Sequence, residues 1–325
     1  MMIHDSVRVG GLSLKNRLVM PPMQTDLTGR GHVTEELLQY YTDRARYSAP
    51  GLIISEHCCI SEQGRADGKQ LSFTDEACVP EHRRLTDAVH AAGSRIFIQL
   101  NHAGNAAEPL HGEALVSASD VRSLRKPDTP VPRPLTKEEI ADLERQFAAA
   151  AKRAVAAGYD GVEIHSAHGY LLNQFYSPLT NRRSDEYGPD RMENRLRFLL
   201  ETVAAVREAI GPEVPLAVRL GGADYMEGGS TEEDAVEACR MLEKAGVDLL
   251  DLSGGMCGFV RKGHREAGYF GSMTEKIWAA VSVPVVLTGG VTKLAEADAL
   301  LRSGKADLVG VGRALFRDAR WGENA

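Results

Sequence analysis

The sequence predicts an α/β protein folded as a (β/α)8 TIM barrel, and three observations support this. Short, almost wholly apolar runs alternate with amphipathic stretches along the chain, and runs without a period of two are typical of parallel strands buried on both faces. Eight such runs occur, and Met20-Pro21-Pro22-Met23 follows the first where a doubly wound sheet would carry a glycine fingerprint. The 325 residues suit a barrel of about 250 residues with insertions. We therefore expect one domain over residues 1–325.

The predicted elements follow in order along the chain. Residues 7–14, with Gly10 and Gly11 in the middle, predict a β-hairpin that covers the bottom of the barrel. The predicted strands are residues 17–20, 51–55, 95–100, 161–165, 215–220, 249–253, 284–288 and 307–312. Apolar residues at i, i+3 and i+4 predict crossover helices, most clearly at residues 140–157, 196–210, 235–245 and 294–301. Thr136 and Thr231, each followed by acidic residues, mark two helix starts.

Two connections are too long to be simple loops. They are residues 101–135, after the third strand, and residues 165–194, after the fourth. Both leave the carboxyl ends of strands, the face on which barrels build their active sites. Functional side chains are therefore expected in these connections and at the other strand ends.

Composition excludes several classes of protein. The balance of 38 Lys plus Arg against 45 Asp plus Glu gives a net charge of -7 without a basic run, so nucleic acid and anionic membranes are poor partners. The five cysteines form no C-x-x-C pair, which indicates reduced thiols and argues against a zinc or iron–sulfur site. Without a secretory segment or an apolar run of about 18 residues, we expect a soluble cytoplasmic protein. Assembly into a homo-oligomer stays open.

Two glycine-rich loops predict a phosphate site. Thr288-Gly289-Gly290 follows the seventh strand, and Gly310-Val311-Gly312-Arg313 follows the eighth. In barrels these two loops present backbone N–H groups to phosphate, and Arg313 would add a charge-assisted contact. Tight turns without a ligand are the alternative, although the joint occurrence of both loops favours phosphate.

Polar side chains at three other strand ends predict the reacting centre. His165, His168 and Tyr170 supply two neutral hydrogen-bond donors and a weak acid, the groups needed to polarise a carbonyl oxygen and deliver a proton. A metal site or a packed histidine pair are the alternatives. Gln99 and Arg219 suit an oxygen-rich ring lying across the barrel top, unless they are buried ion-pair or capping residues.

Several motifs resemble the old yellow enzyme family. They are residues 16–23, residues 98–104, the run from Glu163 through His168-Gly169-Tyr170 to Leu172, Ser177-Pro178, residues 181–183, residues 185–188 and residues 193–195. The resemblance extends from the N-terminal hairpin to Arg313. It implies an NAD(P)H-dependent flavin oxidoreductase, an ene-reductase that binds FMN, takes hydride from NADH or NADPH and passes it to the β-carbon of a small activated alkene.

The resemblance also implies a role for each matched residue. His165 and His168 would bind the substrate carbonyl oxygen, and Tyr170 would donate the proton. The residues that would contact FMN are Pro22, Met23, Gln24, Cys59, Gln99 and Arg219 around the ring and Gly289, Gly290, Gly312 and Arg313 at the phosphate, with no metal.

The chain also departs from the family pattern. Gln24 stands where the family often has Cys or Thr, Asp26 replaces a substrate-contacting Tyr of one subgroup, and Asn105 replaces a common Arg. Two alternatives to ene-reduction stay open. One is a flavin demethylase or dehydrogenase that uses the same histidines, and the other is a flavin-free barrel that binds a phosphorylated metabolite.

Overall fold

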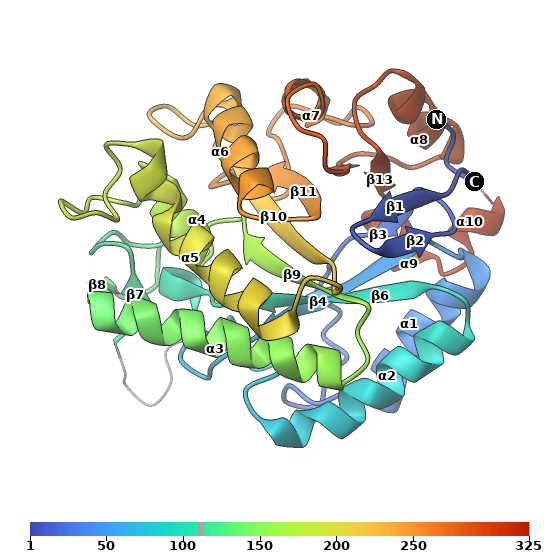
Figure 1. Ribbon diagram of the computed structural model, residues 1–325, viewed down its shortest axis with the longest axis horizontal. Helices are drawn as coiled ribbons and strands as arrows, with labels where there is room; N and C mark the ends of the chain where they lie inside the picture. The colour runs from blue at the N-terminus through green and yellow to red at the C-terminus, as the bar shows by residue number, and fades with distance from the viewer. Residues whose placement is uncertain (109–113, 325) are drawn as a thin grey trace.

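The barrel consists of eight parallel strands that close on themselves (Figure 1). The computed structural model describes residues 1–108 and 114–324. The barrel strands are β3 (Leu18–Met20), β4 (Leu52–Cys59), β6 (Arg95–Asn101), β9 (Gly161–Ser166), β10 (Leu216–Ala223), β11 (Leu249–Gly254), β12 (Val285–Thr288) and β13 (Leu308–Gly310). Strand β3 pairs with both β13 and β4, which closes the barrel and confirms the predicted fold class.

Helices cover the outside of the barrel (Figure 1). They are α1 (Glu35–Tyr47), α2 (Val79–Ala91), α3 (Lys137–Ala156), α5 (Met192–Ile210), α6 (Glu232–Lys244), α7 (Gly271–Trp278), α8 (Leu294–Arg302) and α9 (Arg313–Arg317), with α10 (Trp321–Asn324) following. The predicted starts of α3 and α6 are confirmed, because the Thr136 and Thr231 hydroxyls accept hydrogen bonds from N–H groups of the first turn in capping boxes. No helix in the described part of the chain is long and apolar enough to cross a membrane.

The N-terminal hairpin closes the bottom of the barrel, as predicted. Strands β1 (Val7–Val9) and β2 (Leu12–Leu14) pair antiparallel around Gly10, whose φ of 54° suits the turn. Val9 and Leu14 are fully buried in one cluster with residues from the starts of the barrel strands, among them Leu52 and Phe97. The hairpin therefore leaves only the carboxyl ends of the strands for a ligand.

Three connections build up the open end of the barrel. The connection after β6 contains a short 3-10 turn (Gly104–Ala106), β7 (Val116–Ser117) and β8 (Arg133–Pro134), although residues 109–113 of this predicted insertion lie outside the described residues. The connection after β9 contains α4 (Leu171–Tyr176), which is wholly buried. A third segment, residues 255–270 between β11 and α7, also reaches the open end, and the sequence did not reveal it.

Candidate active site

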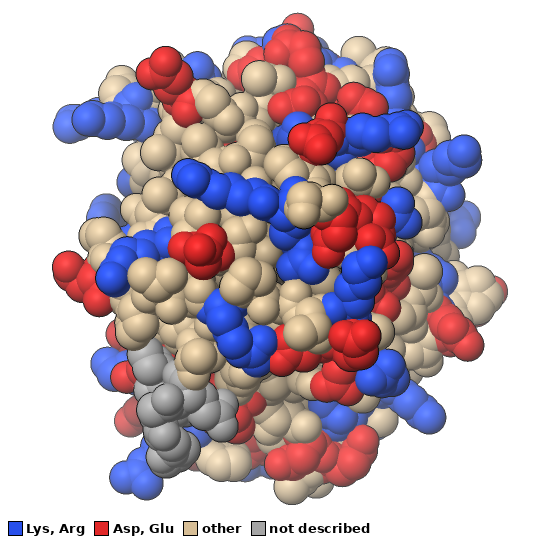
Figure 2. Space-filling model, turned by 90° about the vertical axis from the view of Figure 1, so that its left-hand side faces the viewer, with Lys and Arg blue, Asp and Glu red and all other residues tan. Residues whose placement is uncertain are grey.

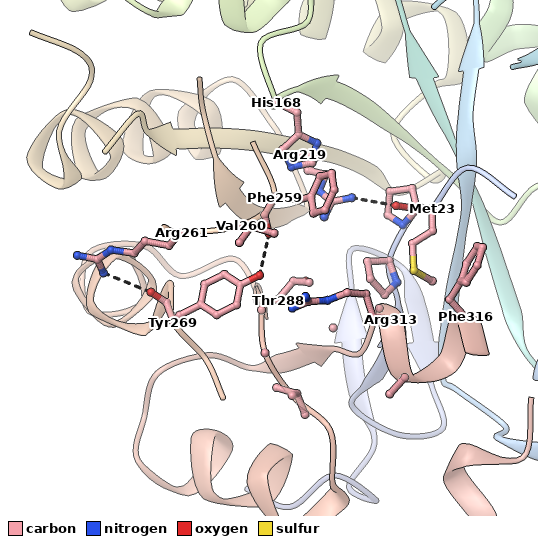
Figure 3. Close-up of a pocket in the computed structure, with 18 of the residues that line it drawn as sticks. Met23, His168, Arg219, Phe259, Val260, Arg261, Tyr269, Thr288, Arg313 and Phe316 are labelled. Carbon is pink, nitrogen blue, oxygen red and sulfur yellow. Dashed lines mark hydrogen bonds between the residues drawn. The ribbon is translucent and has the colours of Figure 1, made fainter. Parts of the chain in front are cut away.

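A cavity of about 1180 Å³ opens at the carboxyl ends of the barrel strands (Figure 3). Its lining includes the predicted residues Pro22, Met23, Gln24, Gln99, His165, His168, Tyr170, Arg219, Gly289, Gly290, Gly312 and Arg313. Ligand pockets usually measure roughly 300–1,000 Å³, so this cavity has room for a flavin and a second ligand together. The structure thus brings the residues from separate strands to one place.

The two histidines and the tyrosine converge at the end of β9. The strand ends at Ser166, and His168 and Gly169 then adopt left-handed backbone conformations with φ of 58° and 71°. This turn brings the His168 ring to 5.1 Å from that of His165 and the Tyr170 ring to 5.2 Å from it, measured between centroids. The Asn173 side chain stabilises the turn, because its Oδ1 accepts a hydrogen bond from the Gly169 N–H at 2.8 Å.

These three side chains are uncharged at neutral pH. Burial, reinforced by the positive charge of Arg219, holds the pKa of His165 and of His168 well below 6.5. The His168 Nε2 lies 2.7 Å from the Ser253 hydroxyl, whereas the buried Nδ1 of His165 has no hydrogen-bond partner in the described structure. Burial also raises the pKa of Tyr170, so its phenol keeps its proton. The site therefore offers neutral donors, which suits a ligand oxygen that gains negative charge.

Gln99 and Arg219 line the cavity floor and also have internal partners. The Gln99 amide donates to the Glu163 carboxyl at 2.8 Å, and the Arg219 Nε lies 3.2 Å from the Asp251 carboxyl. All four side chains are buried, and burial raises the pKa of both carboxyls. The ion-pair alternative is thus present in the structure, but it leaves both side chains at the cavity wall, where a ligand can also reach them.

The two glycines after β12 are packed so closely against neighbouring residues that neither position has room for a side chain. Gly289 and Gly290 have φ of 137° and 72°. A Cβ on Gly289 would lie 2.7 Å from the Tyr269 ring, and one on Gly290 would lie 2.3 Å from the Glu266 carbonyl oxygen. Arg313 lines the same end of the cavity and forms no ion pair with any carboxylate in the described part of the chain. Free backbone and an unpaired guanidinium fit the phosphate of FMN.

Cys59 lies outside the residues that line the cavity. It is buried in β4 beside Cys58, and its carbonyl accepts a hydrogen bond from the Phe73 N–H at 3.0 Å. Burial raises the pKa of the Cys59 thiol to about 11, so it carries no thiolate at neutral pH. Its backbone contact with FMN stays a prediction.

His57 is a site residue that the sequence did not reveal. Strand β4 continues four residues beyond its predicted end, to Cys59, and the imidazole of His57 lines the cavity. The ring stacks on Tyr170, with a centroid distance of 5.4 Å and an angle of 28° between planes. Arg125, Phe259, Arg261 and Tyr269 also line the cavity, from the connections after β6 and β11. A polar residue at a strand end was the available signal for His57. For Arg125 the signal was the length of the connection after the third predicted strand, whereas the connection after β11 carried none.

No group of three or more His, Cys, Asp or Glu side chains that could hold a metal ion occurs within residues 1–108 and 114–324.

Comparisons with known proteins identify the family of this chain. The model of the NADH:flavin oxidoreductase / NADH oxidase family matches residues 3–325. A metal reductase of Desulforamulus reducens is 40% identical over 97% of this chain, and an NADPH dehydrogenase of Clostridium acetobutylicum is 37% identical over 98% of it. The chain spans about half of the length of the metal reductase, 47%, but 92% of the length of the NADPH dehydrogenase.

Solved structures share the fold over the whole chain. The old yellow enzyme homologue from Zymomonas mobilis superimposes with a TM-score of 0.87 at 32% identity, covering 100% of this chain and 93% of its own. The predicted resemblance to the old yellow enzyme family is confirmed, and this membership favours the predicted class of enzyme, a flavin oxidoreductase that uses FMN and NAD(P)H, over the flavin-free alternative. The chain belongs to the NADH:flavin oxidoreductase / NADH oxidase family, the old yellow enzyme family.

Proposed function

We propose that this protein is an ene-reductase, which uses hydride from NAD(P)H to reduce the C=C bond of an α,β-unsaturated carbonyl compound. The observation that carries the proposal is the convergence of two neutral imidazoles and a protonated phenol on the wall of the cavity. The centroid of the His165 ring lies 5.1 Å from that of His168 and 5.2 Å from that of Tyr170. A carbonyl oxygen needs donors as charge develops on it, and the reduced alkene needs a proton.

The residues around the cavity fit FMN, and different residues would contact its ring and its phosphate. Gln99 and Arg219 would bind the polar edge of the ring, and Pro22, Met23, Gln24 and the Cys59 backbone would contact one side of it. The unpaired Arg313 and the glycines Gly289, Gly290 and Gly312 would hold the phosphate. When bound, FMN supplies the hydride that it has taken from NAD(P)H. The relative named NADPH dehydrogenase supports this donor.

His165 and His168 bind the substrate carbonyl oxygen through ring N–H groups. Each donor aimed at a developing oxyanion typically contributes about 3 kcal/mol to the transition state. Tyr170 keeps its proton because burial raises its pKa, and it delivers that proton to the α-carbon. Such general acid catalysis typically contributes about 10²- to 10⁴-fold. The neutral imidazoles draw the electrons of the alkene toward the oxygen, which leaves the β-carbon open to hydride.

Separate half-reactions test this function. Anaerobic NADPH or NADH should bleach the flavin absorbance, and cinnamaldehyde should restore it. Tyr170→Phe should slow the restoration about 10²-fold or more while bleaching changes little, and His165→Ala with His168→Ala should abolish most alkene reduction. Ordinary turnover in the double variant, or equal slowing of both half-reactions by Tyr170→Phe, would refute the assignment. Reduction of the flavin by amines, with no reaction of enals, would favour the demethylase or dehydrogenase alternative.

The cellular location is a further part of this proposal. The composition and the cysteines without C-x-x-C spacing support a cytoplasmic enzyme.

A further inference from the structure

Three arginines of two long connections lie at the mouth of the cavity. Arg125 lies on the connection after β6, and Arg261 and Arg265 lie on the connection after β11. None of the three forms an ion pair with a carboxylate in the described part of the chain, although the net charge of the protein is -7. The acidic residue of the second connection, Glu266, is bonded to the His264 ring. Figure 2, which looks at the left-hand side of Figure 1, shows Lys and Arg side chains around the middle of that face, with acidic ones among them.

Arg125 is tied to the proposed substrate side of the site. Its Nη1 donates to the His168 carbonyl oxygen at 2.7 Å, which leaves the other N–H groups of the guanidinium for a ligand. Its positive charge adds to burial and to Arg219 in lowering the pKa of His168. A negative group beside Arg125 would therefore lie next to the turn that holds the carbonyl-binding histidines.

Apolar side chains line the path between the histidines and the arginines. Phe259 is 54% exposed and Val260 is 39% exposed, which is unusual for residues in a cavity wall unless a ligand covers them. The Phe259 ring lies 6.0 Å from the His168 ring, and the Arg125 guanidinium carbon lies 5.8 Å from the Phe259 ring. A flat apolar body held on Phe259 would thus have histidines at one end and a cation within reach.

Tyr269 separates Arg261 from Arg313 of the proposed FMN phosphate site. Its ring packs against the Cα of Gly289, so that a Cβ there would lie 2.7 Å from it, and its hydroxyl donates to the Phe259 carbonyl oxygen at 2.7 Å. On the other side, its own carbonyl accepts a hydrogen bond from Arg261 at 3.3 Å. In the view of Figure 3, Arg261 and Arg313 lie on opposite sides of Tyr269. Arg261 therefore stands apart from the cation assigned to the FMN phosphate.

We propose that Arg125, Arg261 and Arg265 form a second anion subsite, which selects ligands that carry a carboxylate or phosphate beyond a flat apolar body. The inference rests on the proposed function, because it concerns the ligand that shares the cavity with FMN. Two ligands could supply the anion. One is the unsaturated acceptor, if it bears a charged group remote from its reacting carbonyl, and the other is the nicotinamide dinucleotide with its phosphates.

A binding titration that needs no turnover tests the subsite. The oxidised FMN holoenzyme is titrated with cinnamaldehyde and with 4-carboxycinnamaldehyde, which differ only in a distal carboxylate, and the change in flavin absorbance gives each Kd. The dinucleotide arm compares NADPH with uncharged dihydronicotinamide riboside through the concentration dependence of flavin bleaching. Both arms are run on the wild type, Arg125→Gln, Arg265→Gln and Lys262→Gln. Lys262 is an exposed cation of the same connection that does not line the cavity, so its variant controls for net charge.

The ratio of neutral to charged Kd is the readout, because it cancels any general damage to the cavity. We expect the wild type to favour the charged ligand about tenfold or more in at least one arm, and we expect Arg125→Gln and Arg265→Gln to bring that ratio close to one. Lys262→Gln should leave the ratio unchanged, and 0.3 M salt should weaken the preference. The arm in which the arginine variants change the Kd ratio identifies which ligand supplies the anion.

Two outcomes would overturn the subsite. One is a wild type without preference for charge in either arm, and the other is a preference that Lys262→Gln lowers as much as the arginine variants do. Failure of the proposed function gives a different result, namely a flavin that no nicotinamide bleaches and no enal reoxidises. The aldehyde titration still decides the subsite in that case, since it follows binding to the oxidised enzyme.

Discussion

Replacing Gly290 by alanine tests whether the loop after β12 holds a phosphate or only turns the chain. The new Cβ would lie 2.3 Å from the Glu266 carbonyl oxygen, while ordinary contact begins at 3.4 Å, so one of the two backbones must move by about 1.1 Å. The φ of 72° adds a strain of roughly 1–2 kcal/mol. A displacement of that size removes a well-aimed backbone donor from the proposed phosphate site.

The expected loss of FMN affinity follows from that displacement. A hydrogen bond to a charged group is typically worth about 1.5–3 kcal/mol, so losing one should raise the Kd for FMN roughly 10- to 100-fold. The Kd is measured by reconstituting the apoprotein and following the quenching of flavin fluorescence. Thermal unfolding of the same samples reports the cost to the fold.

Gly246→Ala provides the matched control. Gly246 also has a positive φ, of 90°, but a Cβ there meets nothing within 4 Å, and the residue lies between α6 and β11 at the closed end of the barrel. Its variant should lower the Tm through backbone strain alone and leave the Kd for FMN within about twofold. If Gly290→Ala behaves in the same way, the glycines serve only the turn and the phosphate assignment is refuted.

Two predictions concern pH. Burial raises the pKa of Glu56 from 4.5 to about 7, so its contribution to stability is fully present below pH 4.5 and is lost as the pH rises through about 7. Between pH 5 and 8 the free energy of unfolding of the wild type should fall by roughly 2–3 kcal/mol relative to Glu56→Gln, and parallel denaturant profiles would contradict this. Burial and Arg219 lower the pKa of His165 and His168 well below 6.5. Flavin reoxidation by cinnamaldehyde should therefore show no step near pH 6.5, and a step that His165→Ala removes would argue against neutral histidines.

The architecture was predictable because its signals are local and repeated. A strand buried on both faces is apolar at almost every position, as in residues 95–100, and this pattern is visible without knowledge of its partners. Residues at the carboxyl ends of parallel strands must meet at one end of the barrel, so the proximity of His165 and Arg219 followed from the strand assignment alone. The fold and the part of the cavity wall at the strand ends could therefore be derived from sequence pattern.

The sequence pattern did not predict the end of β4 or the role of residues 255–270, because both depend on contacts between distant segments. Strand β4 was expected to end at Ser55, and the next two residues, Glu56 and His57, are polar. The structure buries both, since the Thr25 N–H and hydroxyl donate to the Glu56 carboxyl at 2.8 and 2.9 Å, from a segment 31 residues away. Residues 255–270 show no period at all, and contacts with distant segments hold them in place. The Met256 N–H donates to the Asp224 carboxylate at 2.7 Å, and the Tyr269 ring packs against Gly289.

Gln24 and Asp26, which depart from the family pattern, show why a single position cannot be interpreted without its neighbours in the structure. The Gln24 Nε2 donates at 3.0 Å to both Asp26 and Asp67, and its Oε1 lies 3.1 Å from the His57 Nε2. The Gln70 Nε2 lies 2.7 Å from the other ring nitrogen of His57 and can only donate. In neutral His57 the Nε2 must therefore carry the proton and donate to Gln24. The Gln24 amide is fully engaged in this chain of hydrogen bonds. Replacing it by the family's Thr would leave the buried imidazole N–H without its acceptor, and the Asp67 carboxylate would keep only the hydrogen bond from the Lys69 N–H at 2.9 Å. The residue at position 24 is thus fixed jointly by the neighbouring Asp26 and by two other segments, the end of β4 at His57 and residues 67–70, which is a dependence that no local pattern can reveal.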